Sequence, residues 1–308
     1  MYFVVFNYNF YKNMSNNQLY IIGNGFDIFH EIQSRYSDFE IYVKHNDKQL
    51  YDVLDEYFNS EDLWSEFEEA LAHIDIDRII ENAEDYLFSY GADDWSDAYH
   101  HSYQDEINNA VSLVTVSLKK HFLNWILSLK IPTNRKIQLP ISSTYLTFNY
   151  TDTLEKVYDI PFSNIEYLHN KAIDENSDLI LGHSKEPTIE NSLEKGINSY
   201  DEDVRITEGN QILDKYFIKT FKQTEEIINE KIAFFNNLSE IKEVFVLGHS
   251  ISAVDIKYYK IILKSISNTV TWTVSYFNQE SKEKLIESLS SIGIRNEDIK
   301  FIKIEDLI

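Results

Sequence analysis

The stretch Leu19–Asp27, with the sequence LYIIGNGFD, decides the fold of this chain. An apolar run that stops at two glycines is typical of a buried strand that ends in a turn. Gly23-Asn24-Gly25 forms this turn, and its bare backbone lets an anion approach closely. The residues from Phe26 to Ile32 can start a helix whose free amide groups and dipole favour phosphate. The stretch predicts a nucleotide site, or else a turn in which the glycines serve geometry alone. Ile28 replaces the third glycine of the dinucleotide fingerprint, so a standard Rossmann dehydrogenase is not predicted.

The composition excludes several classes of protein. The chain has 308 residues, of which 43% are hydrophobic and 14% aromatic, so a large core is available and general disorder is excluded. No apolar run is long enough to span a bilayer. The net charge of -23 repels nucleic-acid phosphate over most of the surface, and neither a basic groove nor a carboxylate metal cluster is visible. We therefore expect no nucleic-acid partner and no membrane partner.

The chain has no cysteine, which removes disulfides, thiol nucleophiles and Cys-ligated zinc. The histidines lack a second ligand set at a useful spacing, so we expect no metal. A reducing compartment fits this composition, and we expect the cytoplasm. Residues 1–17 lack the marks of a signal peptide. We expect them to be an N-terminal extension, either an edge strand or disordered, because Met14 stands just before SNNQLYIIGNG and suggests an upstream start.

Strand and helix signals alternate along the rest of the chain, which predicts one α/β domain over residues 18–308 with a helical insertion at about 37–131. The repeated strand-then-helix units predict a doubly wound, mainly parallel sheet, with a site along its carboxyl edge. Strands are predicted at residues 18–22, 143–148, 164–168, 178–181, 242–247, 269–277 and 298–304. Helices are predicted at residues 213–238, 253–265 and 281–289, and a loop at 185–210.

The insertion carries an apolar stripe along one long helix. Six apolar residues recur at spacings of three and four: Ile107, Val111, Val114, Leu118, Phe122 and Trp125. We expect the insertion to supply homo-oligomer contacts or a lid.

Polar residues follow four of the predicted strands: Gly23-Asn24-Gly25, Asn149 with Asp152, His169, and Gly248-His249-Ser250. In a doubly wound sheet such strand ends converge on one crevice. Each also has a structural interpretation, because a strand-end Asn often satisfies its own turn and a partly buried His is often structural. Likewise, Thr151 or Asp152 can cap the short helix that follows.

Four ordered segments, IGNGFD, LTFNYTDTLEKVY, YLHN and LGHSISAVD, resemble the AbiH family of phage abortive-infection proteins. The chain is also similar to the sirtuin-like fold, which has a Gly-x-Gly turn, an Asp-Phe pair, a Thr-x-Asn strand end, a Leu-His pair and a Gly-x-Ser. The matching residues are Gly23, Gly25, Asp38, Phe39, Thr147, Asn149, Leu168, His169, Gly248 and Ser250. This similarity implies NAD as the ligand. Defence proteins with sirtuin-like domains tend to hydrolyse NAD to ADP-ribose and nicotinamide.

The resemblance implies catalytic roles for Asn149, His169 and Asp152. Asn149 would hold a ribose hydroxyl or a water beneath C1′, His169 would take the proton, and Asp152 would orient the ribose or steady the developing positive charge. The glycine turn would receive the pyrophosphate and Ser250 the adenosine ribose. The implied cofactor-binding residues are Gly23, Asn24, Gly25, Phe26, Asp27, Asp38, Gly248, His249, Ser250 and Asp255. Of these, Asp27, Asp38 and Asp255 can instead cap helices.

Two features depart from the sirtuin pattern. The missing cysteines exclude the usual zinc module, so protein deacetylation is not expected, and Asn170 follows His169 where glycine is commoner. The alternative function is a non-catalytic module that binds NAD or ADP-ribose and signals through the insertion. Gly248 to Ser252 mimics a serine-hydrolase elbow, but no histidine follows His249, whereas that fold places its histidine after the serine.

Overall fold

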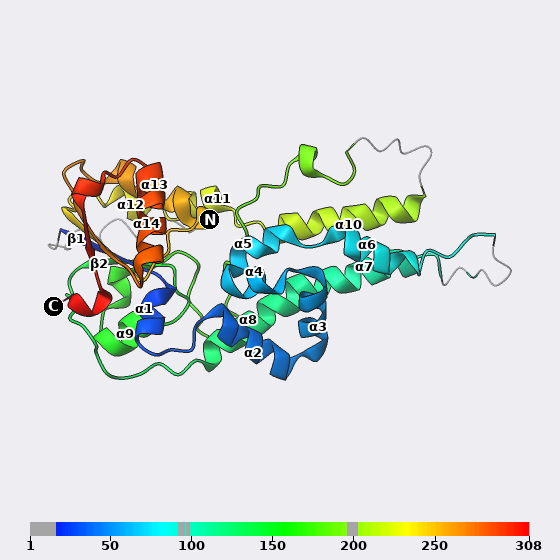
Figure 1. The fold of residues 1–308 in the computed structure, drawn as a ribbon, viewed down its shortest axis with the longest axis horizontal. Helices are drawn as coiled ribbons and strands as arrows, with labels where there is room; N and C mark the ends of the chain where they lie inside the picture. Colours follow the sequence, from blue (N-terminus) through cyan, green and yellow to red (C-terminus); the bar gives the residue numbers. More distant parts are fainter. Residues whose placement is uncertain (1–16, 92–95, 97–98, 196–202, 308) are drawn as a thin grey trace, which may run out of the picture. The chain divides into compact units, whose positions relative to one another are not determined.

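The computed structural model describes residues 17–91, 96, 99–195 and 203–307, and the chain forms two units (Figure 1). The first unit contains the described residues of the ranges 1–35, 126–180 and 223–308, and the second those of 36–125 and 181–222. Of the predicted extension at residues 1–17, all but Asn17 lies outside the described residues. No helix in the described part of the chain is long and apolar enough to cross a membrane.

The first unit is built on a six-stranded sheet in which every neighbouring pair of strands is parallel. Its strands are β1 (Gln18–Ile22), β2 (Thr144–Thr147), β3 (Ile165–Tyr167), β4 (Glu243–Leu247), β5 (Thr271–Ser275) and β6 (Ile299–Ile302). Their order is β3-β2-β1-β4-β5-β6, which is the doubly wound order whose direction reverses between β1 and β4. The predicted fold class is confirmed.

Helices cover both faces of this sheet (Figure 1). Successive side chains of a strand point to opposite faces, so apolar residues of the strands enter two separate cores. Leu19 and Ile21 of β1 pack into a core with residues of α11 (Thr224–Glu230), α12 (Ile232–Asn236), α13 (Ile256–Ser265) and α14 (Gln279–Ser291). Tyr20 and Ile22 pack into a second core with residues of α1 (Asn24–Phe29) and α9 (Thr153–Tyr158). Burial on both faces explains why the four residues of β1 that follow Gln18 are all hydrophobic.

Three predictions of local structure were wrong. Residues 178–181 form no strand. The amide of Ile180 instead donates a hydrogen bond to the carbonyl of His169, in the chain just after β3. Helix α1 begins at Asn24 and ends at Phe29, earlier than expected. The predicted helix at 213–238 is broken after Thr220, because the amide of His183 donates to the carbonyl of Thr220 and the amide of Lys222 donates to the carbonyl of His183. Residues 183 and 221 form a parallel bridge there.

The second unit is helical. Its helices are α2 (Tyr36–Asn46), α3 (Lys48–Tyr57), α4 (Ser60–Ser65), α5 (Phe67–Ala70), α6 (Ile76–Glu84), α7 (Ser102–Ser112), α8 (Leu118–Ser128) and α10 (Val204–Thr220). All six residues of the predicted apolar stripe are buried. A π-helical segment at Leu113–Ser117 joins α7 to α8, so the stripe runs along a helix with one irregular turn.

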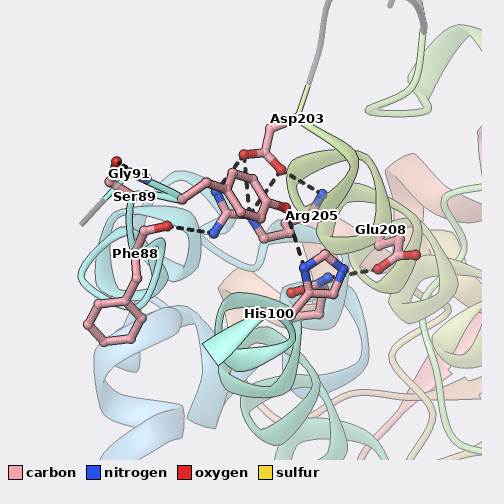
Figure 2. A network of polar contacts seen from close by, with 9 residues as sticks. Phe88, Ser89, Gly91, His100, Asp203, Arg205 and Glu208 are labelled. Carbon is pink, nitrogen blue, oxygen red and sulfur yellow. Dashed lines mark hydrogen bonds and ion pairs between the residues drawn. The ribbon is translucent and has the colours of Figure 1, made fainter. Parts of the chain in front are cut away.

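Helix α10 starts inside the region predicted to be a loop because Arg205 and Asp203 stabilise its first turn (Figure 2). The buried Arg205 guanidinium donates to both carboxylate oxygens of Asp203 and to the carbonyl of Phe88. It also lies 4.1 Å from the centre of the Tyr90 ring. The contact with Asp203 is bidentate and charge-assisted, and the bond to Phe88 connects the start of α10 with the chain that follows α6.

Candidate functional site

The predicted site residues of the first unit follow four adjacent parallel strands, so they lie at the same carboxyl edge of the sheet. Ile22, the last residue of β1, is level with Thr147 of β2 and with Leu247 of β4, and Thr147 is level with Tyr167 of β3. The glycine turn, Asn149, His169 and Gly248 come one or two residues later. The reversal of strand order lies between β1 and β4, at the two glycine-containing ends.

The glycines let two backbone segments touch. Gly25 donates its amide hydrogen to the carbonyl of Gly248 at 2.7 Å, and Gly23 donates to Leu247 at 3.0 Å. A Cβ atom on Gly23 or Gly25 would lie within 2.7 Å of the Gly248 carbonyl oxygen. Gly248 itself has a φ of +65°, a left-handed conformation that side chains disfavour. The Gly25 amide is therefore already hydrogen-bonded within the protein, and the glycine turn holds the end of β1 against the end of β4.

The side chains of this turn point to different places. Asn24 donates a side-chain hydrogen bond to the carbonyl of Ser34 at 2.7 Å. The Phe26 ring is fully buried and packs against His30 and Tyr158. These contacts stabilise α1 and the chain that follows it.

The structure brings Asn149 to the glycine turn. Its side-chain amide donates to the carbonyl of Gly23 at 3.2 Å, and its backbone amide donates to the hydroxyl of Thr147 at 3.1 Å. Asn149 is buried, so the strand end of β2 places an amide beside the strand end of β1.

Asp27 is the buried carboxylate of this edge. The hydroxyls of Thr151 and Thr153 donate to its two oxygens at 2.6 and 2.7 Å. Burial raises the pKa of Asp27 to about 6, against the opposing effect of hydrogen bonds from Thr151, Thr153 and Asn149. Sequence reasoning named Thr151 only as a candidate helix cap and missed Thr153, and the only signal for their contact with Asp27 was their position on either side of Asp152.

Asp152 occupies the N-cap position of α9, but its side chain makes no capping hydrogen bond. It is partly buried, and its carboxylate lies 3.1 Å from the ammonium of Lys156. Its negative charge also contributes to the raised pKa of Asp27.

Replacing Asp27 with Asn should remove a pH dependence of stability. The carboxyl titrates at about pH 6 in the folded protein against an ordinary value of 3.8, so between these values the folded state holds a proton that the unfolded state has lost. The free energy of unfolding should therefore fall as the pH rises through this window, by about 3 kcal/mol at ~1.4 kcal/mol per pKa unit.

Urea unfolding of the wild-type protein and Asp27→Asn at pH 4 and pH 7 tests this prediction. The variant should gain about 2 kcal/mol relative to the wild type between the two pH values, because its amide stays neutral and the unfolded wild-type carboxyl is already partly ionised at pH 4. The Thr hydroxyls can rotate to suit an amide. A constant difference between the two proteins would show that Asp27 is ionised in the folded state across this range.

Two histidines and a carboxylate meet beside the ring of Phe148. His169 is 3% exposed and its Nε2 atom lies 3.8 Å from Oδ1 of Asp255. His249 is 6% exposed and its Nε2 atom lies 3.5 Å from Oδ2 of the same carboxylate. The Phe148 ring lies against both imidazoles.

Of the other predicted contacts, Ser250 is exposed and follows β4, and Asp38 belongs to the first turn of α2, in the second unit. Asp255 stands at the N-cap position of α13 without a side-chain capping bond. Among the residues that the structure describes, no set of three His, Asp or Glu side chains is placed to hold a metal ion.

The family model described as Bacteriophage abortive infection AbiH matches residues 19–276. The chain belongs to the AbiH family. The matched span covers β1 to β5 and includes all four strand ends at the carboxyl edge. Membership confirms the family resemblance and places this AbiH protein in abortive infection against bacteriophage. No curated protein and no solved structure matches the chain at a significant level.

The carboxyl edge of this AbiH protein offers three kinds of polar group. The amide of Asn149 can donate and accept hydrogen bonds, the imidazole of His169 can take up a proton, and the carboxylates of Asp27 and Asp255 can balance a positive charge. Such groups suit a reaction that develops positive charge on the substrate and releases a proton.

Proposed function

We propose that this AbiH protein defends against phage by hydrolysing NAD to ADP-ribose and nicotinamide at the carboxyl edge of its sheet. The observation that supports this most is the strand order, with Asn149 and His169 at the ends of adjacent strands beside the β1–β4 reversal. Open α/β sheets bind nucleotides outside their carboxyl ends at such a reversal. NAD is a dinucleotide whose pyrophosphate and ribose groups suit this position.

The proposed reaction breaks the bond between the nicotinamide nitrogen and ribose C1′. The bonding electrons leave with nicotinamide, which becomes neutral, and C1′ acquires oxocarbenium character. A water molecule then bonds to C1′ and its proton passes to His169, so the products are ADP-ribose, nicotinamide and one proton. Asn149 positions the water or a ribose hydroxyl, and the partly buried carboxylate of Asp152 stabilises the positive charge.

The Asn149→Ala and His169→Ala variants test this proposal in a chromatographic assay of nicotinamide release from NAD. We expect the wild-type protein to release nicotinamide and each variant to do so about 10²-fold more slowly or less, the usual effect of losing such a group. The matched controls are Asn164→Ala and His45→Ala. Asn164 is half-buried and precedes β3, so it lies at the amino edge of the sheet, and His45 is an exposed residue of α2.

Binding measured by calorimetry on the same proteins separates hydrolysis from binding alone. NAD binding without nicotinamide release would make this AbiH protein a sensor or interaction module. Neither binding nor release, or equal release by the four variants, would overturn the assignment of the site.

A further inference from the structure

Three buried side chains from separate segments converge on one point of the first unit. His169 follows β3, His249 follows β4, and Asp255 stands at the start of α13. The two imidazole Nε2 atoms lie 3.8 and 3.5 Å from different oxygens of the one carboxylate. A buried carboxylate is costly unless positive or hydrogen-bonding groups compensate it, and the start of a helix also favours negative charge.

The protonation of His249 follows from its other nitrogen. Nδ1 accepts a hydrogen bond from the backbone amide of Ile251 at 2.9 Å, so it carries a lone pair and the ring proton lies on Nε2. Oδ2 of Asp255 lies 3.5 Å from that nitrogen. Protonating Nδ1 would break the bond to Ile251, a buried residue at a φ of +54°. With Nδ1 as an acceptor, His249 is neutral and its ring proton lies on the nitrogen beside Asp255.

His169 lies on the other side of the carboxylate. Among the groups that face it are the rings of Phe148, Tyr150 and Tyr258, from the end of β2 and from α13, and Oδ1 of Asp255. The rings offer little stabilisation to a proton on the imidazole compared with the carboxylate, because an opposite charge within about 4 to 6 Å favours the charged form.

We propose that Asp255 is a positioning residue for His169, and that neutral His249 holds its carboxylate in place. Asp255 turns Nε2 of His169 toward itself and stabilises the imidazolium. Its effect on catalysis rests on the proposed NAD hydrolysis, in which the proton of the attacking water moves to His169 and then to solvent. The effect on the imidazole itself does not depend on that reaction.

The test uses the full chain labelled with ¹⁵N-histidine and follows the imidazole titration of His169 by NMR, with the signal assigned by its loss in His169→Ala. We expect Asp255→Asn to lower the titration midpoint of His169. We expect His249→Asn to raise it, because the Asn side chain can still accept from the Ile251 amide but no longer donates to Asp255. The control is Asp298→Asn, a half-buried carboxylate that accepts hydrogen bonds from Arg295 and precedes β6 at the amino edge of the sheet, and it should leave the midpoint unchanged.

Kinetics add a second readout. In Asp255→Asn, kcat for nicotinamide release should fall by about 10²-fold with a small change in KM, as expected when a proton acceptor loses its orienting partner. An unchanged His169 midpoint in both variants would overturn the proposal. If Asp255→Asn does not fold, the His169 midpoint in His249→Asn decides the proposal alone. If the wild-type protein releases no nicotinamide, the proposed function fails while the titrations still decide the role of Asp255.

Discussion

Replacing Gly248 with Ala should lower the free energy of unfolding by more than about 4 kcal/mol or prevent folding, an effect reserved for severe steric conflicts. The new Cβ would lie 2.1 Å from the backbone nitrogen of Phe26 and 2.4 Å from the carbonyl carbon of Gly25. Backbone atoms of a packed strand end cannot move aside as a flexible side chain can. Gly248 also has a positive φ, which adds strain for any residue with a Cβ.

Gly293→Ala is the matched control because it isolates the strain. Gly293 has a φ of +95°, but a Cβ there would meet nothing within 4 Å. We expect a loss of about 1 to 2 kcal/mol from the backbone conformation alone. Urea unfolding of the two variants measures the difference, which is the contribution of the close contact between the β1 and β4 ends. Equal losses would show that the two ends do not approach as closely as described.

Phe39→Ala should destabilise the second unit by about 3 to 5 kcal/mol, as large-to-small changes in aromatic cores do. Phe39 is fully buried in α2. Its ring centre lies 5.0 Å from that of Trp125, 5.3 Å from Phe122 and 5.6 Å from Phe67. Removing the ring loses both its burial and these ring contacts, and leaves a cavity.

Thermal unfolding followed by tryptophan fluorescence measures this loss, because Trp125 lies in the same cluster. The control is Ile41→Ala on the same helix, where the side chain is 56% exposed and we expect a change within about 0.5 kcal/mol. A small effect of Phe39→Ala would mean that the cluster repacks around the missing ring. The result also bears on the Asp38-Phe39 pair, since a core role explains the aromatic residue without a ligand.

The apolar pattern of the sequence was enough to predict the doubly wound sheet. Leu19 and Ile21 enter one core and Tyr20 and Ile22 the other, and such a run bounded by glycine is a strand signal that needs no distant partner. The apolar stripe from Ile107 to Trp125 was likewise predicted from the spacing of neighbouring residues alone. The placing of Asn149 and His169 after predicted strands followed from the same pattern, since parallel strands end at one edge.

Only the tertiary structure determined which polar groups meet at that edge. Thr151 and Thr153 bind Asp27 across 124 and 126 positions of the chain, and Asp255 lies between two histidines that follow different strands. The same holds for the Gly25 amide, which bonds to Gly248. Hydrophobic periodicity records which face of an element is buried, but not which element will pack against it. Hydrogen-bond partners and the raised pKa of Asp27 depend on that packing, because burial and neighbouring groups exist only after the chain has folded.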